Sequence, residues 1–250
     1  MDGSTAPTVD RGQQLRSVGT SLGLTVGGFL VAVIVVVLGI TALSAFGIDI
    51  QQQPVLGTGL SIVFQGAGFG VAVLLYMAVT DNWDLVGIRV PTLRDVGYAV
   101  AGLVALFAGY LAIAGIVSYL GVTPAQNDIV EAGQQNPALV PLLIPLAILV
   151  VGPSEELLFR GAIQGVLRES YSAVPAIAIA SLLFGVAHVF ALLGGPLSGI
   201  LVYISVTFVL GMILGYIYER TDNVVVPSLV HGVYNAILFT LLYVQVSGGL

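Results

Sequence analysis

Polar side chains that could carry out chemistry occur in three apolar stretches in the second half of this 250-residue chain. Both histidines of the chain are among them. In chain order these residues are Glu155, Glu156, Arg160, His188, His231 and Asn235. Ionisable groups inside a membrane are costly and usually mark a functional site. Carboxylate, imidazole and amide groups can activate water and stabilise an oxyanion, so this set predicts hydrolysis of a peptide bond.

The first stretch places two glutamates before an arginine. On a helix, Glu156 and Arg160 are four residues apart and share a face, with the glutamate in the favourable N-terminal position. Glu155 points roughly 140° away from Arg160, at about 100° per residue. We therefore expect Glu156 to be the counter-ion of Arg160, and Glu155 to be a general base that lacks a local partner. Pro153 predicts a kink or a helix start beside it. The structural alternative is an ion pair that only holds helices together.

The second stretch contains His188 one helical turn after Phe184, so both side chains project from the same face. A neutral imidazole can orient water or transfer a proton near neutral pH. Gly185 between them would allow another helix to approach closely. The structural alternative is a buried histidine that is bonded to a nearby carbonyl or serine.

The third stretch contains His231 and Asn235, again four residues apart on one face. An imidazole and an amide that point together supply the donors that suit a developing oxyanion. The structural alternative is a hydrogen-bonded pair between helices, which contributes about 1 kcal/mol in a membrane.

The composition indicates which elements must position these residues. Hydrophobic residues make up 57% of the chain and charged residues only 8%. This excludes a soluble domain, a disordered chain and a nucleic-acid binder with a basic face. Cysteine is absent, which excludes thiolate catalysis and disulfides. Charge-poor runs of about 20 residues predict an all-α, polytopic bundle of transmembrane helices. The seven expected spans are Ser21–Phe46, Gly57–Thr80, Val96–Leu120, Ala138–Leu167, Ala173–Leu193, Ser198–Tyr218 and Val224–Val246.

All seven basic residues are arginines, and six of them lie outside the expected spans or at their ends. They occur before the first span and in alternate loops, at Arg11, Arg16, Arg89, Arg94, Arg168 and Arg220. The loops at 47–56, 121–137 and 194–197 carry none. The positive-inside rule therefore predicts a cytoplasmic N-terminus in a multi-pass protein of the cell membrane. We divide the chain into a polar cytoplasmic segment (1–20), N-terminal membrane helices (21–136) and catalytic helices (137–246).

The three motifs together resemble the CPBP intramembrane proteases, also called the type II CAAX prenyl endopeptidase or Abi family. The matching pieces are Glu155-Glu156-x-x-x-Arg160, Phe184-x-x-x-His188 and His231-x-x-x-Asn235, in the family's order, between about Pro137 and Leu242. Well-described members have eight spans, so an eighth span is the alternative to the seven counted here.

The resemblance implies a glutamate-dependent protease that needs no cofactor or metal. By matched position, Glu155 and His188 would activate water, while His231 and Asn235 would form the oxyanion hole. Glu156, Arg160 and Phe184 would support them. The resemblance also implies a cavity that opens toward the cytosol, where the arginine-bearing loops are expected. Its partners would be membrane lipids and a protein or peptide substrate, with a prenylated C-terminus as one form of that substrate.

Two other classes of function remain open from the sequence. One is a zinc metalloprotease with Glu155, His188 and His231 as ligands, although the usual His-Glu-x-x-His signature is absent. The other is a non-catalytic membrane scaffold or transporter that uses the same buried polar groups. The substitution Glu155→Gln separates an enzyme from a scaffold, because it keeps the shape of the side chain and removes the base.

Overall fold

The computed structural model describes residues 10–192 and 195–248, and every long element in this part of the chain is helical. Within these described residues, seven helices are long and apolar enough to cross a membrane, which confirms the predicted fold class and the predicted seven spans. They are α1 (Arg11–Ala45), α2 (Pro54–Thr80), α3 (Leu93–Tyr119), a composite fourth span (Pro137–Arg168), a fifth span (Ala173–Leu192) that begins with α8 (Ala173–Ala187), α9 (Leu197–Thr221) and α10 (Val225–Val246).

The first helix begins ten residues earlier than its predicted span. Asp10 caps its N-terminus by accepting a hydrogen bond from the backbone N–H of Gly12. Residues 11–20 of the predicted polar segment are therefore the first turns of α1, while residues 1–9 lie outside the described residues. Leu193, the predicted end of the fifth span, and Gly194 lie outside them as well.

The fourth span changes its helical pitch on both sides of the glutamate pair. It consists of α5 (Val140–Leu146), a π-helical segment (Ala147–Val151), α6 (Gly152–Glu156), a second π-helical segment (Leu157–Gln164) and α7 (Gly165–Arg168). Pro153 has no backbone N–H to donate to the preceding turn, which explains the interruption at Gly152. Such π-helical interruptions occur often at functional sites.

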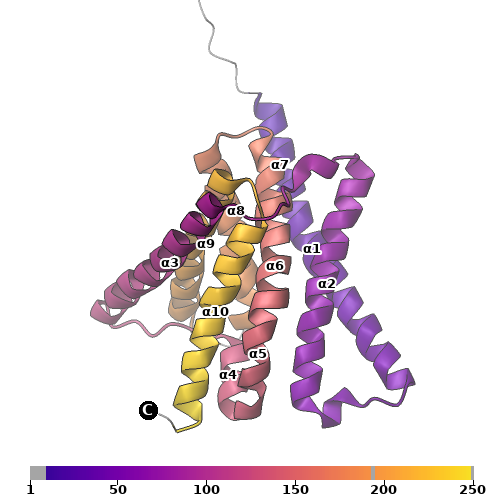
Figure 1. Cartoon of the computed structure of the whole chain (residues 1–250), viewed down its shortest axis with the longest axis vertical. Helices are drawn as coiled ribbons and strands as arrows, with labels where there is room; N and C mark the ends of the chain where they lie inside the picture. The colour runs from indigo at the N-terminus through magenta and orange to yellow at the C-terminus, as the bar shows by residue number, and fades with distance from the viewer. Residues whose placement is uncertain (1–9, 193–194, 249–250) are drawn as a thin grey trace, which may run out of the picture.

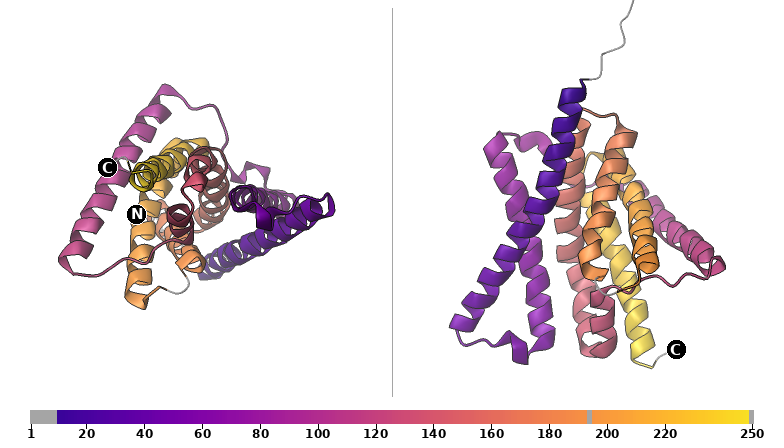
Figure 2. Two further views of the ribbon diagram at one scale, coloured as in Figure 1. Left: turned by 90° about the horizontal axis from the view of Figure 1, so that it is seen from below. Right: turned by 180° about the vertical axis from the view of Figure 1, so that it is seen from behind.

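The bundle places the fourth span in its centre. Helices α1 and α2 pair on one side of it and α3 lies on the other, with α10 between α3 and the fourth span (Figures 1 and 2). Helix α10 packs against α3, α5, α6 and α9. The short helix α4 (Asp128–Gln135) lies at the end of the bundle where the fourth span begins.

Two glycines allow the fourth span and α10 to approach closely. A Cβ atom on Gly152 would lie 2.5 Å from the carbonyl oxygen of Ser228, and one on Gly232 would lie 2.7 Å from the carbonyl oxygen of Ala147. Neither backbone leaves room for a side chain at these positions. The contact brings His231, which precedes Gly232, next to the glutamate pair that follows Gly152.

Candidate active site

The centre of the site is a buried chain of charged and polar groups between the fourth span and α10. Glu156 Oε2 lies 3.1 Å from Arg160 Nε, and both side chains are fully buried. The other carboxylate oxygen, Glu156 Oε1, lies 2.9 Å from His231 Nδ1. The predicted Glu156–Arg160 ion pair is therefore present, and it also holds a histidine from another helix.

This contact determines which nitrogen of His231 carries a proton. A carboxylate that is paired with Arg160 can only accept hydrogen bonds, so His231 Nδ1–H must be the donor. In the neutral ring the remaining nitrogen, Nε2, is then an acceptor, and it donates only when the ring is an imidazolium. His231 Nε2 lies 4.0 Å from Glu155 Oε2.

Glu155 finds its neighbour on another helix, as the helical geometry predicted. Its side chain is 19% exposed, whereas that of Glu156 is fully buried. Glu155 Oε2 is buried and forms no hydrogen bond within the described part of the chain. The 4.0 Å separation from His231 Nε2 is too long for a direct hydrogen bond and suits a bridging water. Glu155 thus has an unused acceptor that faces an imidazole.

His188 lies where α8 ends and a short 3₁₀ helix, His188–Leu192, begins. Its Nδ1–H donates to the carbonyl oxygen of Phe184 at 2.8 Å, because a carbonyl can only accept. The structural alternative for His188, a histidine that is bonded to a nearby carbonyl, is therefore correct for its Nδ1 atom. The second nitrogen, Nε2, is left as an acceptor in the neutral ring.

Phe184 packs against both imidazoles and the arginine. The centroid of its ring lies 4.7 Å from that of His188 and 5.9 Å from that of His231, edge to face in both cases. The Arg160 guanidinium carbon lies 4.9 Å from the centre of the same ring, a cation–π distance. Gly185, next to Phe184, packs against the backbone of α9 at Ile204, as expected for a close helix approach.

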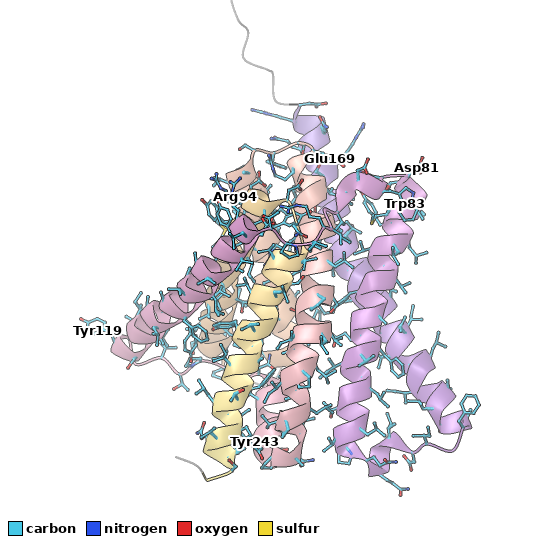
Figure 3. The ribbon with its side chains drawn as sticks, viewed as in Figure 1. Asp81, Trp83, Arg94, Tyr119, Glu169 and Tyr243 are labelled. Atoms are coloured by element: carbon cyan, nitrogen blue, oxygen red, sulfur yellow. The ribbon has the colours of Figure 1, made fainter. Side chains whose placement is uncertain are left out.

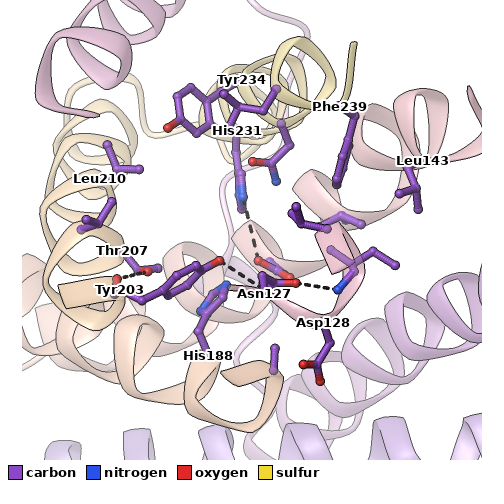
Figure 4. A pocket seen from close by; sticks show the side chains of 18 of the residues that line it. Asn127, Asp128, Leu143, His188, Tyr203, Thr207, Leu210, His231, Tyr234 and Phe239 are labelled. Atoms are coloured by element: carbon purple, nitrogen blue, oxygen red, sulfur yellow. Dashed lines mark hydrogen bonds and ion pairs between the residues drawn. The ribbon is translucent and has the colours of Figure 1, made fainter. Parts of the chain in front are cut away.

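A cavity of about 1170 Å³ is lined by residues from all three motifs. Its lining includes all four predicted catalytic residues, Glu155, His188, His231 and Asn235. Figure 4 shows His188 and His231 projecting into the pocket from opposite sides. Most of the remaining lining is apolar and comes from α2, α3, α9 and α10. The three motifs therefore meet around one space that can admit water and a polypeptide.

Sequence reasoning missed two residues of this cavity. Tyr203 of α9 lies with its ring 6.1 Å from that of His188, and its hydroxyl accepts a hydrogen bond of 3.1 Å from Asn127 Nδ2 (Figure 4). Asn127 caps the N-terminus of α4. A tyrosine in an apolar span was the available signal, because a buried tyrosine hydroxyl usually has a polar partner.

The cavity extends toward the end of the bundle whose loops carry no arginine. Its exposed polar lining residues Gln126, Asp128 and Gln134 lie on or beside α4, and Gln245 lies near the end of α10. Figure 3 shows Tyr119 and Tyr243 at this end and Arg94 at the other. The sequence expectation of a cavity that opens toward the cytosol, on the side of the arginine-bearing loops, stays a prediction.

The zinc alternative requires three ligands around one point. Within the described residues no group of three or more His, Asp or Glu side chains is arranged to hold a metal ion. The donor set of Glu155, His188 and His231 therefore does not fit a zinc site as it stands.

Comparison with known proteins agrees with the motif pattern. The family model described as type II CAAX prenyl endopeptidase Rce1-like matches residues 137–237. No curated protein and no solved structure matches the chain. The matched range begins at the fourth span, extends into α10 and contains all four predicted catalytic residues. The predicted resemblance is confirmed: residues 137–237 are similar to the Rce1-like family of type II CAAX prenyl endopeptidases, which are membrane proteases.

Proposed function

We propose that the chain hydrolyses peptide bonds within the membrane by means of Glu155, His188, His231 and Asn235. The observation that carries this proposal is the shared cavity, in which the unbonded Glu155 Oε2 faces His231 Nε2 across 4.0 Å. Glu155, with His188 Nε2 as a second acceptor, would bind and deprotonate the attacking water. Residues 137–246 would form the catalytic unit, and α1–α3 would support it, with α2 and α3 also lining the cavity.

In the proposed reaction, the water oxygen forms a bond to the carbonyl carbon of the substrate and Glu155 accepts the proton of that water. The carbonyl oxygen becomes an oxyanion, to which Asn235 donates from its side-chain amide. The C–N bond then breaks, and the proton held by Glu155 passes to the leaving amine. The products are a carboxylic acid and an amine, and Glu155 returns to its starting state.

Glu156 is a positioning residue in this scheme. It receives Nδ1–H of His231, so Nε2 can donate to the oxyanion only when His231 is an imidazolium. The oxyanion-hole role of His231 therefore depends on Glu156, and the bond of 2.9 Å supports this dependence.

The substrate is a protein or peptide in a membrane of lipids, and the cell membrane is the expected location. The wide apolar lining of the cavity suits an extended peptide or a lipid chain attached to it. Farnesylated and unmodified C-terminal peptides are therefore the two substrate classes to compare.

The direct test is cleavage of a peptide library in detergent, with and without farnesylated C-termini. We expect Glu155→Gln to reduce kcat by about 100-fold or more, because general-base catalysis contributes on the order of 10²–10⁴-fold. Glu169→Gln is the matched control, since Glu169 lies outside the cavity and contacts Asn82. Equal cleavage by wild type and Glu155→Gln would remove the proposed function.

The rival functions give different results in the same assay. A metalloprotease would lose activity with a chelator and regain it with zinc, whereas the proposed enzyme keeps its activity in chelator. A scaffold would cleave nothing and would keep its cellular phenotype after Glu155→Gln.

The positioning role of Glu156 has its own readout. We expect Glu156→Gln to lower kcat more than it changes KM, because the neutral amide no longer holds the Nδ1–H of His231 with a charged acceptor. Glu156→Asp should restore part of the wild-type kcat. A purely structural role would lower the thermal stability while leaving kcat of the folded fraction unchanged.

A further inference from the structure

Tyr203 of α9 has a hydroxyl proton that no group in the described part of the chain accepts. Asn127 Nδ2 donates to the hydroxyl oxygen at 3.1 Å, and Asn127 Oδ1 accepts from the backbone N–H of Ile129 at 3.0 Å. The second bond fixes the orientation of the amide, so its NH₂ group, which can only donate, faces Tyr203. The hydroxyl oxygen is therefore the acceptor, and its own proton stays available to a group in the cavity.

The hydroxyl lies among the groups that would activate water. The Tyr203 ring is 6.1 Å from that of His188, and the Glu155 carboxylate interacts electrostatically with the hydroxyl. All three side chains line the same cavity. Figure 4 shows Tyr203 reaching from α9 toward His188, while His231 enters the pocket from another side. Tyr203 thus places a neutral proton donor beside the residues that would bind the attacking water.

Hydrolysis of a peptide bond needs a proton donor at this place. The amide nitrogen leaves readily only when it gains a proton, and Glu155 holds the proton that was taken from water. The oxyanion donors are expected on α10, whereas Tyr203 lies on α9 beside His188. A phenol keeps its proton near neutral pH, and its oxygen can take up one proton while it releases another.

We propose that Tyr203 is the general acid that protonates the leaving amine of the substrate. The tyrosine proton passes to the nitrogen as the C–N bond breaks, and the proton held by Glu155 passes to the tyrosine oxygen. Both side chains then return to their starting states, with no proton gained or lost. The N–H of Asn127 stabilises the negative charge that develops on the tyrosine oxygen during the transfer. The role rests on the proposed function and adds the residue through which the amine is protonated.

Two substrates with the same acyl part separate this role from binding or packing. One is a peptide, and the other is an aryl ester, whose phenolate departs without a proton. We expect Tyr203→Phe, which keeps the ring, to lower kcat for the peptide on the order of 100-fold and to leave kcat for the ester nearly unchanged. Tyr216→Phe is the matched control, because Tyr216 lies on the same helix, is exposed and contacts Arg220 outside the cavity.

Asn127→Asp provides a second variant, which leaves the ring and the hydroxyl of Tyr203 in place. An aspartate can still cap α4 at Ile129, but its second oxygen can only accept, so it takes up the Tyr203 proton. We expect the same selective loss for the peptide, and no further loss when Asn127→Asp is combined with Tyr203→Phe. If Tyr203→Phe does not fold, Asn127→Asp decides the question in the same two assays.

The outcomes distinguish a failure of this role from a failure of the proposed function. Unchanged peptide cleavage in Tyr203→Phe would overturn the role of Tyr203, and so would equal losses on the peptide and the ester. Glu155→Gln should lose activity on both substrates, since both require activated water. If Glu155→Gln cleaves the peptide like wild type, the proposed function fails, and the role of Tyr203 fails with it.

Discussion

The N-terminal and C-terminal spans are similarly apolar, but the molecule uses them differently. Within the most apolar window of each helix, only 11% of α1 is buried, compared with 50% of α10. The buried charged side chains of the fourth span, Glu156 and Arg160, and His231 of α10 belong to the C-terminal region. Hydropathy therefore identifies which segments cross the membrane, while buried polar residues identify which of them surround the cavity.

The two regions also use close helix contacts for different purposes. Gly68 of α2 packs directly against the backbone of Ala32 in α1, and Gly232 of α10 packs against Ala147 and Ile148 of the fourth span. The first contact joins two helices without a charged group between them. The second positions His231 beside Glu155 and Glu156. The same packing device therefore serves stability in one region and chemistry in the other.

The largest effect after Glu155→Gln is expected for His188→Ala. This change removes the second acceptor for the attacking water, so kcat should fall by about 100-fold or more. The fold should persist, because His188 bonds only to a carbonyl within its own helix end. Cleavage assays together with thermal unfolding in detergent check this prediction, and wild-type kcat would contradict it.

A loss of comparable size is expected for Asn235→Ala. Removing one donor to an oxyanion costs on the order of 10²–10³-fold in kcat. KM should change little, because the interaction forms in the transition state. A higher KM with unchanged kcat would show that Asn235 binds the substrate in its ground state and has no oxyanion role.

The matched changes Gly232→Ala and Gly68→Ala test the comparison of the two contacts. Each forces a methyl group into backbone, which should cost about 1–3 kcal/mol of stability. Only Gly232→Ala should also lower kcat of the folded protein, since it moves His231 away from the glutamates. Equal kcat for both variants would show that the site tolerates this displacement.

The smallest effects are expected at the surface. Gly23 on α1 has open space where a Cβ would lie, so Gly23→Ala should not destabilise the protein or change kcat. Glu219→Gln should cost about 1 kcal/mol or less, since the Arg168–Glu219 pair is partly exposed. A large loss of stability in Gly23→Ala would indicate a packing partner on this face of α1.

The fold was predictable because long apolar runs can satisfy their backbone hydrogen bonds within lipid only by forming helices. Predicted and observed helix ends mostly agree within a few residues, for example Gly57–Thr80 against Pro54–Thr80. The start of α1 was missed because a polar segment can still form helix when Asp10 caps it. The π-helical segments around the glutamate pair were missed as well, since their pitch depends on packing as well as on Pro153.

The site was predictable only in part. The Glu156–Arg160 pair follows from a spacing of four residues on one helix. The Glu156–His231 bond joins residues 75 positions apart, so no local pattern could reveal it. The bond between Tyr203 and Asn127 also depends on how the helices pack. Spacing along one helix thus identifies which polar groups belong to the site. How the helices pack determines which nitrogen of His231 carries a proton and how accessible each polar group is.

The most direct test of the central claim is a double-mutant cycle of kcat/KM with Glu155→Gln and His188→Ala. If both groups act on one water, removing the second should cost little once the first is gone. We therefore predict that the double variant cleaves about as slowly as the slower single variant. Losses that multiply in the double variant would show that the two residues act independently, which would contradict a shared site of water activation.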